Sequence, residues 1–218
     1  MKKFSFPSRG LYVITDASLH RGEALEQAVS RAIAGGAKVV QYRDKGDDAR
    51  RRAAEAAALV RVCRRHGVAM IVNDDIELAL ASGADGVHLG RDDAPLSAAR
   101  RRLGPRRIVG VSCYNLPARA ESAQRDGADY VAFGSMFRSS TKPDAARADI
   151  STIRSVRPRI HLPIVAIGGI TPQNGASLLD AGVDLLAVVR GVFGNDDPAE
   201  SAREYTQLFD RQATDEKR

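Results

Sequence analysis

The chain has 218 residues, of which 44% are hydrophobic and 28% are charged. This composition is ordinary for one globular domain and excludes a disordered chain, a collagen-like repeat and a disulfide scaffold. The two cysteines, Cys63 and Cys113, are too few for a disulfide framework and indicate a reducing compartment, so we expect a cytoplasmic protein. No apolar run approaches the ~20 residues that span a bilayer, and the basic first residues lack the apolar segment of a secretory signal.

The charge balance is basic, because 33 lysines and arginines against 27 aspartates and glutamates give a net charge of +6. This balance favours anionic partners such as nucleic acids, phosphorylated metabolites or acidic surfaces. Aromatic residues make up only 5% of the chain and tryptophan is missing, so a stacking platform for single-stranded nucleic acid has little material. We expect small anionic molecules as partners, with neither nucleic acid nor membrane, and the sequence leaves a homo-oligomer open.

Short apolar, β-branched runs alternate along the chain with Ala-, Leu- and Arg-rich stretches of helical periodicity. The runs are continuously apolar, which predicts strands covered on both faces, as in a parallel sheet. The expected strands are 11–15, 39–43, 70–73, 86–89, 108–112, 130–134, 164–167 and 185–189. The expected helices are 22–34, 48–66, 75–82, 95–103, 117–126, 149–156, 172–181 and 198–208.

Local signals mark the ends of these helices. Four of them begin near a proline, where a missing N–H costs nothing, and Thr171 before Pro172 is an expected N-cap. A similar turn recurs at 34–38, 82–85, 126–129 and 181–184, each time between a helix and the next strand. One turn used four times is typical of a repeating βα architecture.

Eight βα units in about 200 residues are the minimum for a (β/α)₈ barrel. An open doubly wound sheet is the alternative, but the chain lacks an early G-x-G-x-x-G fingerprint and its units are evenly spaced, which favours closure. No linker divides the sequence, so we expect one parallel-stranded barrel domain over 1–211 and a frayed, charged tail over 212–218. Function in such a barrel lies at the carboxyl ends of the strands.

Charged and polar residues follow the second expected strand. Gln41, Arg43 and Lys45 are spaced by two, so an extended chain points them to one side. Two cations and an amide at one place suit a polyanion such as pyrophosphate. A surface ion-pair cluster around Asp44 is the alternative, and the position at the expected active rim argues against it.

Carboxylates follow the third and fourth expected strands. Asp74 and Asp93 come from neighbouring strand ends and can share one hard cation, since Mg²⁺ takes one or two carboxylates plus water and phosphate oxygens. For the nearby Asp75 and Asp92 we prefer helix capping or compensation of the helix dipole.

Three residues around the fourth and fifth expected strands are of types that often act in catalysis. His88 lies within its strand, so we expect a buried, hydrogen-bonded core histidine rather than a metal ligand or base. Ser112 has no obvious histidine partner and is interpreted as a hydrogen-bond donor. Cys113 is expected to be structural.

The last three strand ends carry a second anion site. The loop after the sixth strand is rich in hydroxyls and ends in lysine, which predicts a phosphate cradle and a lid. Its residues are Ser139, Ser140, Thr141 and Lys142. The loops after the seventh and eighth strands contain Gly168-Gly169 and Arg190-Gly191, where phosphate binds in many barrels. Two anion pockets suggest an enzyme that joins a diphosphate to a monophosphate.

Several segments resemble a known family when they are taken together and in order. They are QYRDK at 41–45, VND at 72–74, HLGRDD at 88–93, SSTKP at 139–143 and AIGGI at 166–170, within a match from 10 to 198. This set is similar to the thiamine phosphate synthase family. The resemblance implies a (β/α)₈ barrel that couples 4-amino-2-methyl-5-hydroxymethylpyrimidine diphosphate with a thiazole phosphate, or its carboxylated form, to give thiamine phosphate and pyrophosphate with Mg²⁺.

The resemblance also implies roles for individual residues. The residues expected to hold the pyrimidine diphosphate are Gln41, Tyr42, Arg43, Asp44, Lys45, Asn73, Ser112 and Lys142. The residues expected to hold the thiazole phosphate are Ser139, Ser140, Thr141, Gly169, Val189 and Arg190. Asp74 and Asp93 are expected to bind one Mg²⁺, and Arg43, Lys45, Ser112 and Lys142 are the expected catalytic residues.

The family's mechanism fits this residue chemistry. Pyrophosphate leaves first, and the thiazole nitrogen attacks the resulting pyrimidine-stabilised carbocation, so no strong nucleophile or base is needed. The site must neutralise the leaving group, which Arg43, Lys45, Lys142 and Mg²⁺ can do. Two departures stand out, namely Arg190 where the family often has Ser and Ser139 where Thr is common.

Two other hypotheses compete with this one. A thiazole tautomerase, or another phosphate-binding barrel isomerase, shares the fold but predicts neither a Mg²⁺ requirement nor pyrophosphate release. The tautomerase branch loses the Asp pair and the Lys-bearing loop, and both are present here. A basic nucleic-acid-binding module predicts a steep loss of affinity with salt, and it leaves the carboxylates at two strand ends unexplained.

Overall fold

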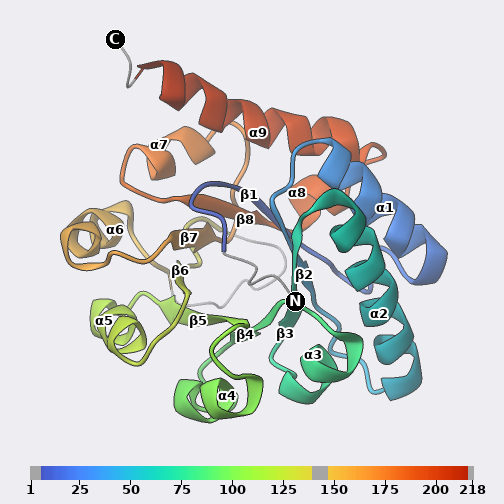
Figure 1. Ribbon diagram of the computed structural model, residues 1–218. Helices are drawn as coiled ribbons and strands as arrows, with labels where there is room; N and C mark the ends of the chain where they lie inside the picture. The colour runs from blue at the N-terminus through green and yellow to red at the C-terminus, as the bar shows by residue number, and fades with distance from the viewer. Residues whose placement is uncertain (1–5, 139–146, 216–218) are drawn as a thin grey trace.

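The computed structural model describes residues 6–138 and 147–215, and within these residues eight parallel strands close into a barrel (Figure 1). The strands are β1 (Gly10–Ile14), β2 (Val39–Tyr42), β3 (Ala69–Asn73), β4 (Gly86–Leu89), β5 (Ile108–Tyr114), β6 (Tyr130–Phe133), β7 (Ile164–Ile167) and β8 (Leu185–Val188). Strand β1 pairs with both β2 and β8, which closes the ring. The predicted (β/α)₈ barrel is confirmed, and the open doubly wound sheet is wrong.

Helices surround the barrel (Figure 1). They are α1 (Gly22–Ala34), α2 (Ala49–His66), α3 (Ile76–Ser82), α4 (Leu96–Leu103), α5 (Pro117–Arg125), α6 (Ile150–Val156) with the 3₁₀ turn η1 (Arg157–Arg159), α7 (Gly175–Leu179), α8 (Arg190–Phe193) and α9 (Pro198–Asp215). None of the described helices combines the length and the apolar character that crossing a membrane requires.

Three helices differ from the sequence prediction. Helix α7 begins at Gly175 rather than Pro172, because 172–174 form a turn in which Asn174 Oδ1 accepts from the backbone N–H of Thr171 at 2.8 Å. The expected N-cap role of Thr171 is therefore wrong. Helix α8 was not predicted, since four residues are too short to show a helical period.

Helix α9 continues to Asp215, past the expected end at Leu208. Arg9 holds this extension, since its Nη2 donates to the carbonyl of Phe209 at 3.2 Å and to Gln212 Oε1 at 2.6 Å. Residues 212–215 of the expected tail are thus helical, and 216–218 lie outside the described residues. The sequence did not predict this helical extension, because the tail is charged and the hydrogen bonds that hold it come from Arg9, near the other end of the chain.

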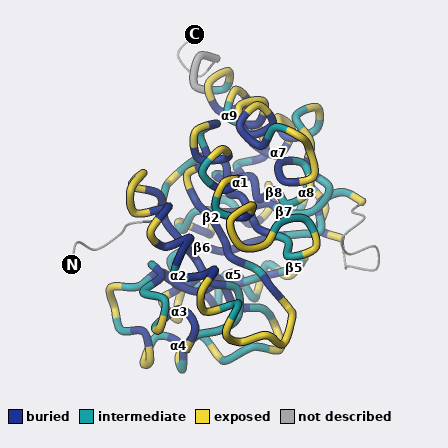
Figure 2. The backbone as a smooth tube through the Cα atoms, turned by 90° about the vertical axis from the view of Figure 1, so that its right-hand side faces the viewer, coloured by how far each residue is buried: buried dark blue, intermediate teal, exposed yellow. Residues whose placement is uncertain are grey.

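Each strand is buried on both of its faces. In β1, Tyr12 and Ile14 pack inside the barrel, while Leu11 and Val13 pack against the helices, and all four are at most 4% exposed. Figure 2 shows that the backbone at the centre of the molecule is buried, while exposed residues lie on the outer sides of the helices. The continuous apolar runs of the sequence reflect this double burial.

The repeated turn in the sequence has a structural cause. Three of the four turns end in an aspartate whose carboxylate accepts a hydrogen bond from a backbone N–H at the start of the preceding strand, at 2.7–2.9 Å. The pairs are Asp85 with Met70, Asp129 with Val109, and Asp184 with Ile164. Asp129 and Asp184 also pair with Arg100 and Arg157, each at 2.7 Å. These bonds tie β3 to β4, β5 to β6 and β7 to β8 at the amino-terminal face.

We expect the variant Asp129→Ala to lower the free energy of unfolding by about 1–3 kcal/mol, because the N–H of Val109 loses its side-chain acceptor. Urea unfolding measures this change. The matched control is Asp126→Ala, which removes an exposed carboxylate three residues away and should change stability by less than about 0.5 kcal/mol. Equal stability of the two variants would contradict the role of Asp129.

Candidate active site

A cavity of about 420 Å³ opens at the carboxyl ends of the strands. Its wall includes polar residues from seven strand ends, namely Gln41, Arg43, Asn73, His88, Ser112, Arg138, Thr171 and Arg190. Apolar side chains such as Ile14, Val165 and Ile167 complete it. The site therefore lies where the fold predicted it. A second hollow of about 370 Å³ lies near the amino-terminal face, where Arg157 is engaged by Asp184 and backbone carbonyls.

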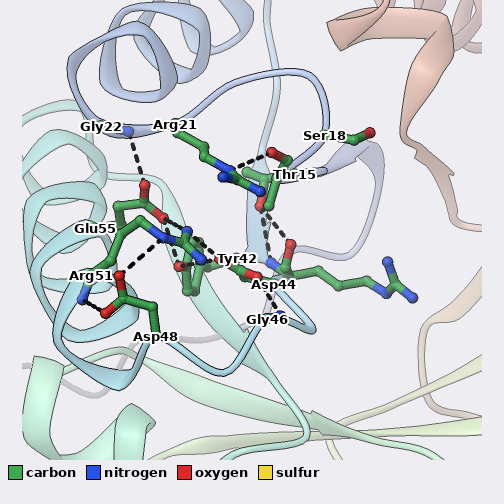
Figure 3. Close-up of polar contacts among 12 residues, drawn as sticks. Thr15, Ser18, Arg21, Gly22, Tyr42, Asp44, Gly46, Asp48, Arg51 and Glu55 are labelled. Atoms are coloured by element: carbon green, nitrogen blue, oxygen red, sulfur yellow. Dashed lines mark hydrogen bonds and ion pairs between the residues drawn. The ribbon is translucent and has the colours of Figure 1, made fainter.

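The end of β2 sends alternate side chains in opposite directions. Gln41 and Arg43 line the cavity, as the spacing by two predicted, whereas Lys45, the third residue of that spacing, is exposed, pairs with Asp74 and is not part of the wall. Tyr42 is 2% exposed and donates to Glu55 Oε2 at 2.7 Å, and Asp44 pairs with Arg51 on α2. Figure 3 shows Tyr42 and Asp44 gathered with Arg51 and Glu55 beside this helix. The expectation that Tyr42 and Asp44 bind substrate is therefore wrong, because both face the helix layer.

The ion-pair cluster around Asp44, which the sequence argued against, is present and buried. Burial alone would raise the pKa of Asp44, but the hydrogen bonds from Arg51 and from the backbone N–H of Gly46 outweigh it and lower the pKa. Burial and the Glu55 carboxylate raise the pKa of Tyr42, which keeps its hydroxyl protonated. The cluster anchors the segment after β2 to helix α2.

The backbone of Arg43 is fixed independently from the neighbouring strand. Its N–H donates to Thr15 Oγ1 at 2.9 Å, directly after β1. Burial acts to raise the pKa of Asp16, but the hydrogen bonds from Ser18 outweigh it and the pKa is lowered. The positive charges of Arg190 and Arg43 add to this lowering. Both arginines line the cavity, and Arg190 is exposed.

The two expected metal ligands lie together beside the cavity. Asp74 accepts from Asn73 Nδ2 at 2.6 Å and pairs with Lys45. Asp93 accepts from the backbone N–H of Gly90 at 2.6 Å. Burial and the adjacent Asp74 carboxyl raise the pKa of Asp93, as is expected where two carboxylates lie close together. Asp74 also has a left-handed backbone, with φ of 63°.

The neighbouring aspartates differ from one another. Asp75 caps helix α3, with its Oδ1 accepting from the N–H of Leu78 at 2.9 Å, so its predicted structural role is confirmed. Asp92 is not the N-cap of a helix, because α4 begins at Leu96 after Pro95, so the capping alternative is wrong for this residue.

Ser112 has the histidine partner that the sequence did not reveal. Its Oγ lies 2.8 Å from His88 Nε2, so the statement that it lacks one is wrong. The two residues are 24 positions apart and meet because β4 and β5 are adjacent. His88 is 8% exposed and its Nδ1 faces Tyr130 Oη at 2.9 Å, so the prediction of a buried, bonded histidine is confirmed. With a tyrosine in place of a carboxylate, the pair is not a Ser-His-Asp triad.

The glycines after β7 are required by close packing. Gly168 and Gly169 have φ of 104° and 62°, and a Cβ on either would overlap the segment after β6, at Ser135 and at the carbonyl of Arg138 respectively. The backbone therefore borders the cavity without side chains in the way. Val189, before α8, lines the same side.

Some site residues were missed, and others cannot be placed. Arg138 and Thr171 line the cavity, and their position just after a strand was the signal that could have identified them. Cys113 is buried, which raises the pKa of its thiol to about 12 and agrees with a structural role. The expected phosphate residues Ser139, Ser140, Thr141 and Lys142 lie outside the described residues, so their roles stay predictions.

Comparisons with known proteins agree on one family. Residues 11–192 match the family model for thiamine monophosphate synthase. The thiamine-phosphate synthase of Methylococcus capsulatus is 50% identical over 204 residues, which cover 94% of this chain and 91% of that protein. The thiamine-phosphate synthase of Thiobacillus denitrificans is 51% identical over 205 residues, which cover 94% and 96% of the two chains.

Solved structures give the same picture. The thiamine phosphate pyrophosphorylase of Pyrococcus furiosus superimposes with a TM-score of 0.85 at 33% identity, over 94% of this chain and 96% of that chain. A 3-hexulose-6-phosphate synthase superimposes with a TM-score of 0.69 at 18% identity, which shows the common barrel alone. Both the sequence and the fold therefore place this chain in the thiamine monophosphate synthase family.

Proposed function

We propose that the protein condenses 4-amino-2-methyl-5-hydroxymethylpyrimidine diphosphate with a thiazole phosphate, giving thiamine phosphate and pyrophosphate. The observation that carries the proposal is the crowded carboxylate pair Asp74–Asp93 with Lys45, at the edge of a cavity lined by arginines, in a chain of this family. A tautomerase or isomerase releases no pyrophosphate, so its reaction does not require a carboxylate pair that holds a metal ion beside a leaving group.

Asp74 and Asp93 fit one Mg²⁺. Two partly buried carboxylates that repel each other are stabilised by a divalent cation between them, and Mg²⁺ needs only one or two carboxylates in addition to water and phosphate oxygens. No third His, Cys, Asp or Glu joins them among the described residues, which leaves coordination positions for a diphosphate. When bound, Mg²⁺ supplies positive charge to the leaving pyrophosphate.

The residues of the cavity divide between the two substrates. Arg43 and Lys45 bind the diphosphate, and Ser112 donates a hydrogen bond to it. Gln41 and Asn73 hold the pyrimidine ring. The thiazole phosphate occupies the opposite side, where the backbone at Gly169 and the segment Val189–Arg190 border the cavity.

The chemistry asks for charge stabilisation rather than a nucleophile. Departure of pyrophosphate leaves a carbocation on the pyrimidine methylene, and the thiazole nitrogen then attacks it. The arginine and lysine side chains stabilise the leaving group, and apolar walls at Ile14, Val165 and Ile167 exclude water from the cation. The His88–Ser112 pair is not needed to form a covalent intermediate.

Pyrophosphate release by the purified protein tests this proposal. We expect release only when both substrates and Mg²⁺ are present, and loss of release after addition of a chelator. Release of no pyrophosphate under any condition would contradict the synthase and favour a tautomerase or another phosphate-binding isomerase.

We expect Asp93→Ala and Lys142→Ala each to lower kcat at least ~10²-fold without unfolding the protein. Asp93→Ala removes a ligand of the Mg²⁺ that would stabilise the leaving group, and Lys142→Ala removes a positive charge beside it. The matched control is Asp92→Ala, since Asp92 is an exposed carboxylate next to Asp93 and outside the cavity. Steady-state kinetics and thermal unfolding measure the three variants. Unchanged activity in both Asp93→Ala and Lys142→Ala would remove the site assignment.

Arg190 should contribute to binding rather than to chemistry. Its exposed side chain at the cavity makes a partly screened charge contact with the thiazole phosphate, so we expect Arg190→Ala to raise KM for that substrate ~3- to 10-fold. The KM for the pyrimidine diphosphate should stay within ~2-fold. A fall in kcat with both KM values unchanged would contradict this role.

A further inference from the structure

A continuous series of hydrogen bonds crosses the floor of the cavity. We call Gln41, Tyr12, Tyr130, His88 and Ser112 the floor network. Gln41 Nε2 donates to Tyr12 Oη at 2.7 Å, Tyr12 Oη lies 2.9 Å from Tyr130 Oη, Tyr130 Oη lies 2.9 Å from His88 Nδ1, and His88 Nε2 lies 2.8 Å from Ser112 Oγ. Its two ends, Gln41 and Ser112, both line the cavity.

The two tyrosines of the network are held rigidly. Tyr12 and Tyr130 are at most 1% exposed, and Phe6 stacks on the ring of Tyr130 with centroids 4.0 Å apart. Gly110 faces this ring, and any Cβ there would overlap it. Burial raises the pKa of both hydroxyls, so each keeps its single proton. Within residues 6–138 and 147–215, neither hydroxyl bonds to a group outside the network.

With the Gln41 amide placed so that its Nε2 faces Tyr12, the network runs in one direction. The amide NH₂ of Gln41 can only donate, so Tyr12 Oη accepts a hydrogen bond from it and donates one to Tyr130 Oη. Tyr130 then donates to His88 Nδ1, and a neutral imidazole with an acceptor Nδ1 carries its proton on Nε2. His88 Nε2–H donates to Ser112, which leaves the Ser112 hydroxyl proton for the cavity and the Gln41 carbonyl oxygen as an acceptor there.

The reversed direction is the other self-consistent state with a neutral imidazole. In it Ser112 donates to His88, the imidazole proton moves to Nδ1, and Tyr12 donates to the Gln41 carbonyl oxygen. Ser112 then presents only an acceptor to the cavity, and Gln41 presents its NH₂. An anion beside Ser112 disfavours this state, because an oxyanion requires a donor.

We propose that the floor network couples the two ends of the pyrimidine site, so that a diphosphate at Ser112 orients Gln41 to accept a hydrogen bond and thereby selects a ring with an amino group over one with an oxo group. This inference rests on the proposed function for its substrate. Tyr12, Tyr130 and His88 are then positioning residues for specificity, and none of them performs a step of the reaction.

The variant Tyr130→Phe tests the coupling, because it removes the middle hydroxyl and keeps the ring. The measurement is the ratio of kcat/KM for the amino pyrimidine diphosphate to that for its oxo analogue. We expect the wild-type ratio to be at least ~30-fold and the variant to lower it at least ~5-fold, mainly through a lower KM for the analogue. Tyr12→Phe breaks the next link and should act in the same way, which covers the case that Tyr130→Phe fails to fold.

The matched control is Tyr42→Phe, which removes another buried tyrosine hydroxyl that lies outside the cavity and the network. It should leave the ratio unchanged. An unchanged ratio in Tyr130→Phe and Tyr12→Phe, in enzymes that still make thiamine phosphate, overturns the coupling and leaves the proposed function intact. Failure of the wild-type protein to turn over the amino substrate would instead count against the proposed function.

A second measurement does not depend on turnover. With Mg²⁺ and pyrophosphate added, ¹⁵N NMR should show His88 neutral and protonated at Nε2, its signals being assigned among the four histidines with the variant His88→Asn. Tyr130→Phe should reduce the population of this tautomer. A wild-type His88 that is protonated at Nδ1, or at both nitrogens, with pyrophosphate present would overturn the proposed direction.

Discussion

Strands that are buried on both faces leave polar groups only two positions, namely the strand ends or a hydrogen-bonded network inside the barrel. Three sets of polar contacts among the described residues follow from that constraint. At the amino-terminal face, Asp85, Asp129 and Asp184 tie neighbouring strands together. At the carboxyl-terminal face, the strand ends carry the candidate site. Between them, the buried hydroxyls of Tyr12 and Tyr130 bond to Gln41, to each other and to His88, which in turn contacts Ser112.

The site combines a rigid support with charged groups that face the ligand. The cluster of Tyr42, Asp44, Arg51 and Glu55 fastens the segment after β2 to α2, while the N–H of Arg43 is held by Thr15 (Figure 3). Positioning of this kind lets an arginine act on a leaving group without losing conformational freedom on binding. Alternate residues of the segment 41–44 thus have different roles, since Gln41 and Arg43 face the cavity while Tyr42 and Asp44 face the helix layer.

Much of this arrangement could be predicted from the sequence. Strands that are buried on both faces give continuous apolar runs, and the repeated turns give a recurring sequence motif. These two patterns were enough to predict the barrel and the location of the site at the carboxyl ends of its strands. The spacing by two placed Gln41 and Arg43 correctly in the cavity. The same spacing predicts that Tyr42 and Asp44 lie outside the cavity, but the family resemblance assigned all of 41–45 to substrate binding.

What could not be predicted depends on contacts between distant residues. Ser112 and His88 meet only because their strands are neighbours in the sheet, and nothing local in the sequence records the 2.8 Å contact. The extension of α9 to Asp215 likewise depends on Arg9, about 200 positions away. Helix α8 is too short to leave a periodic signal.

In the proposed reaction, the leaving group binds between the Asp74–Asp93 pair and Ser112, on the side of the cavity away from Gly169. A crystal structure of the protein with Mg²⁺ and pyrophosphate tests it most directly. We expect one metal ion that contacts both carboxylates and the pyrophosphate, with Arg43 and Ser112 bonded to the same pyrophosphate. Pyrophosphate bound at Gly169 and Arg190, with no metal ion at the two aspartates, would contradict it.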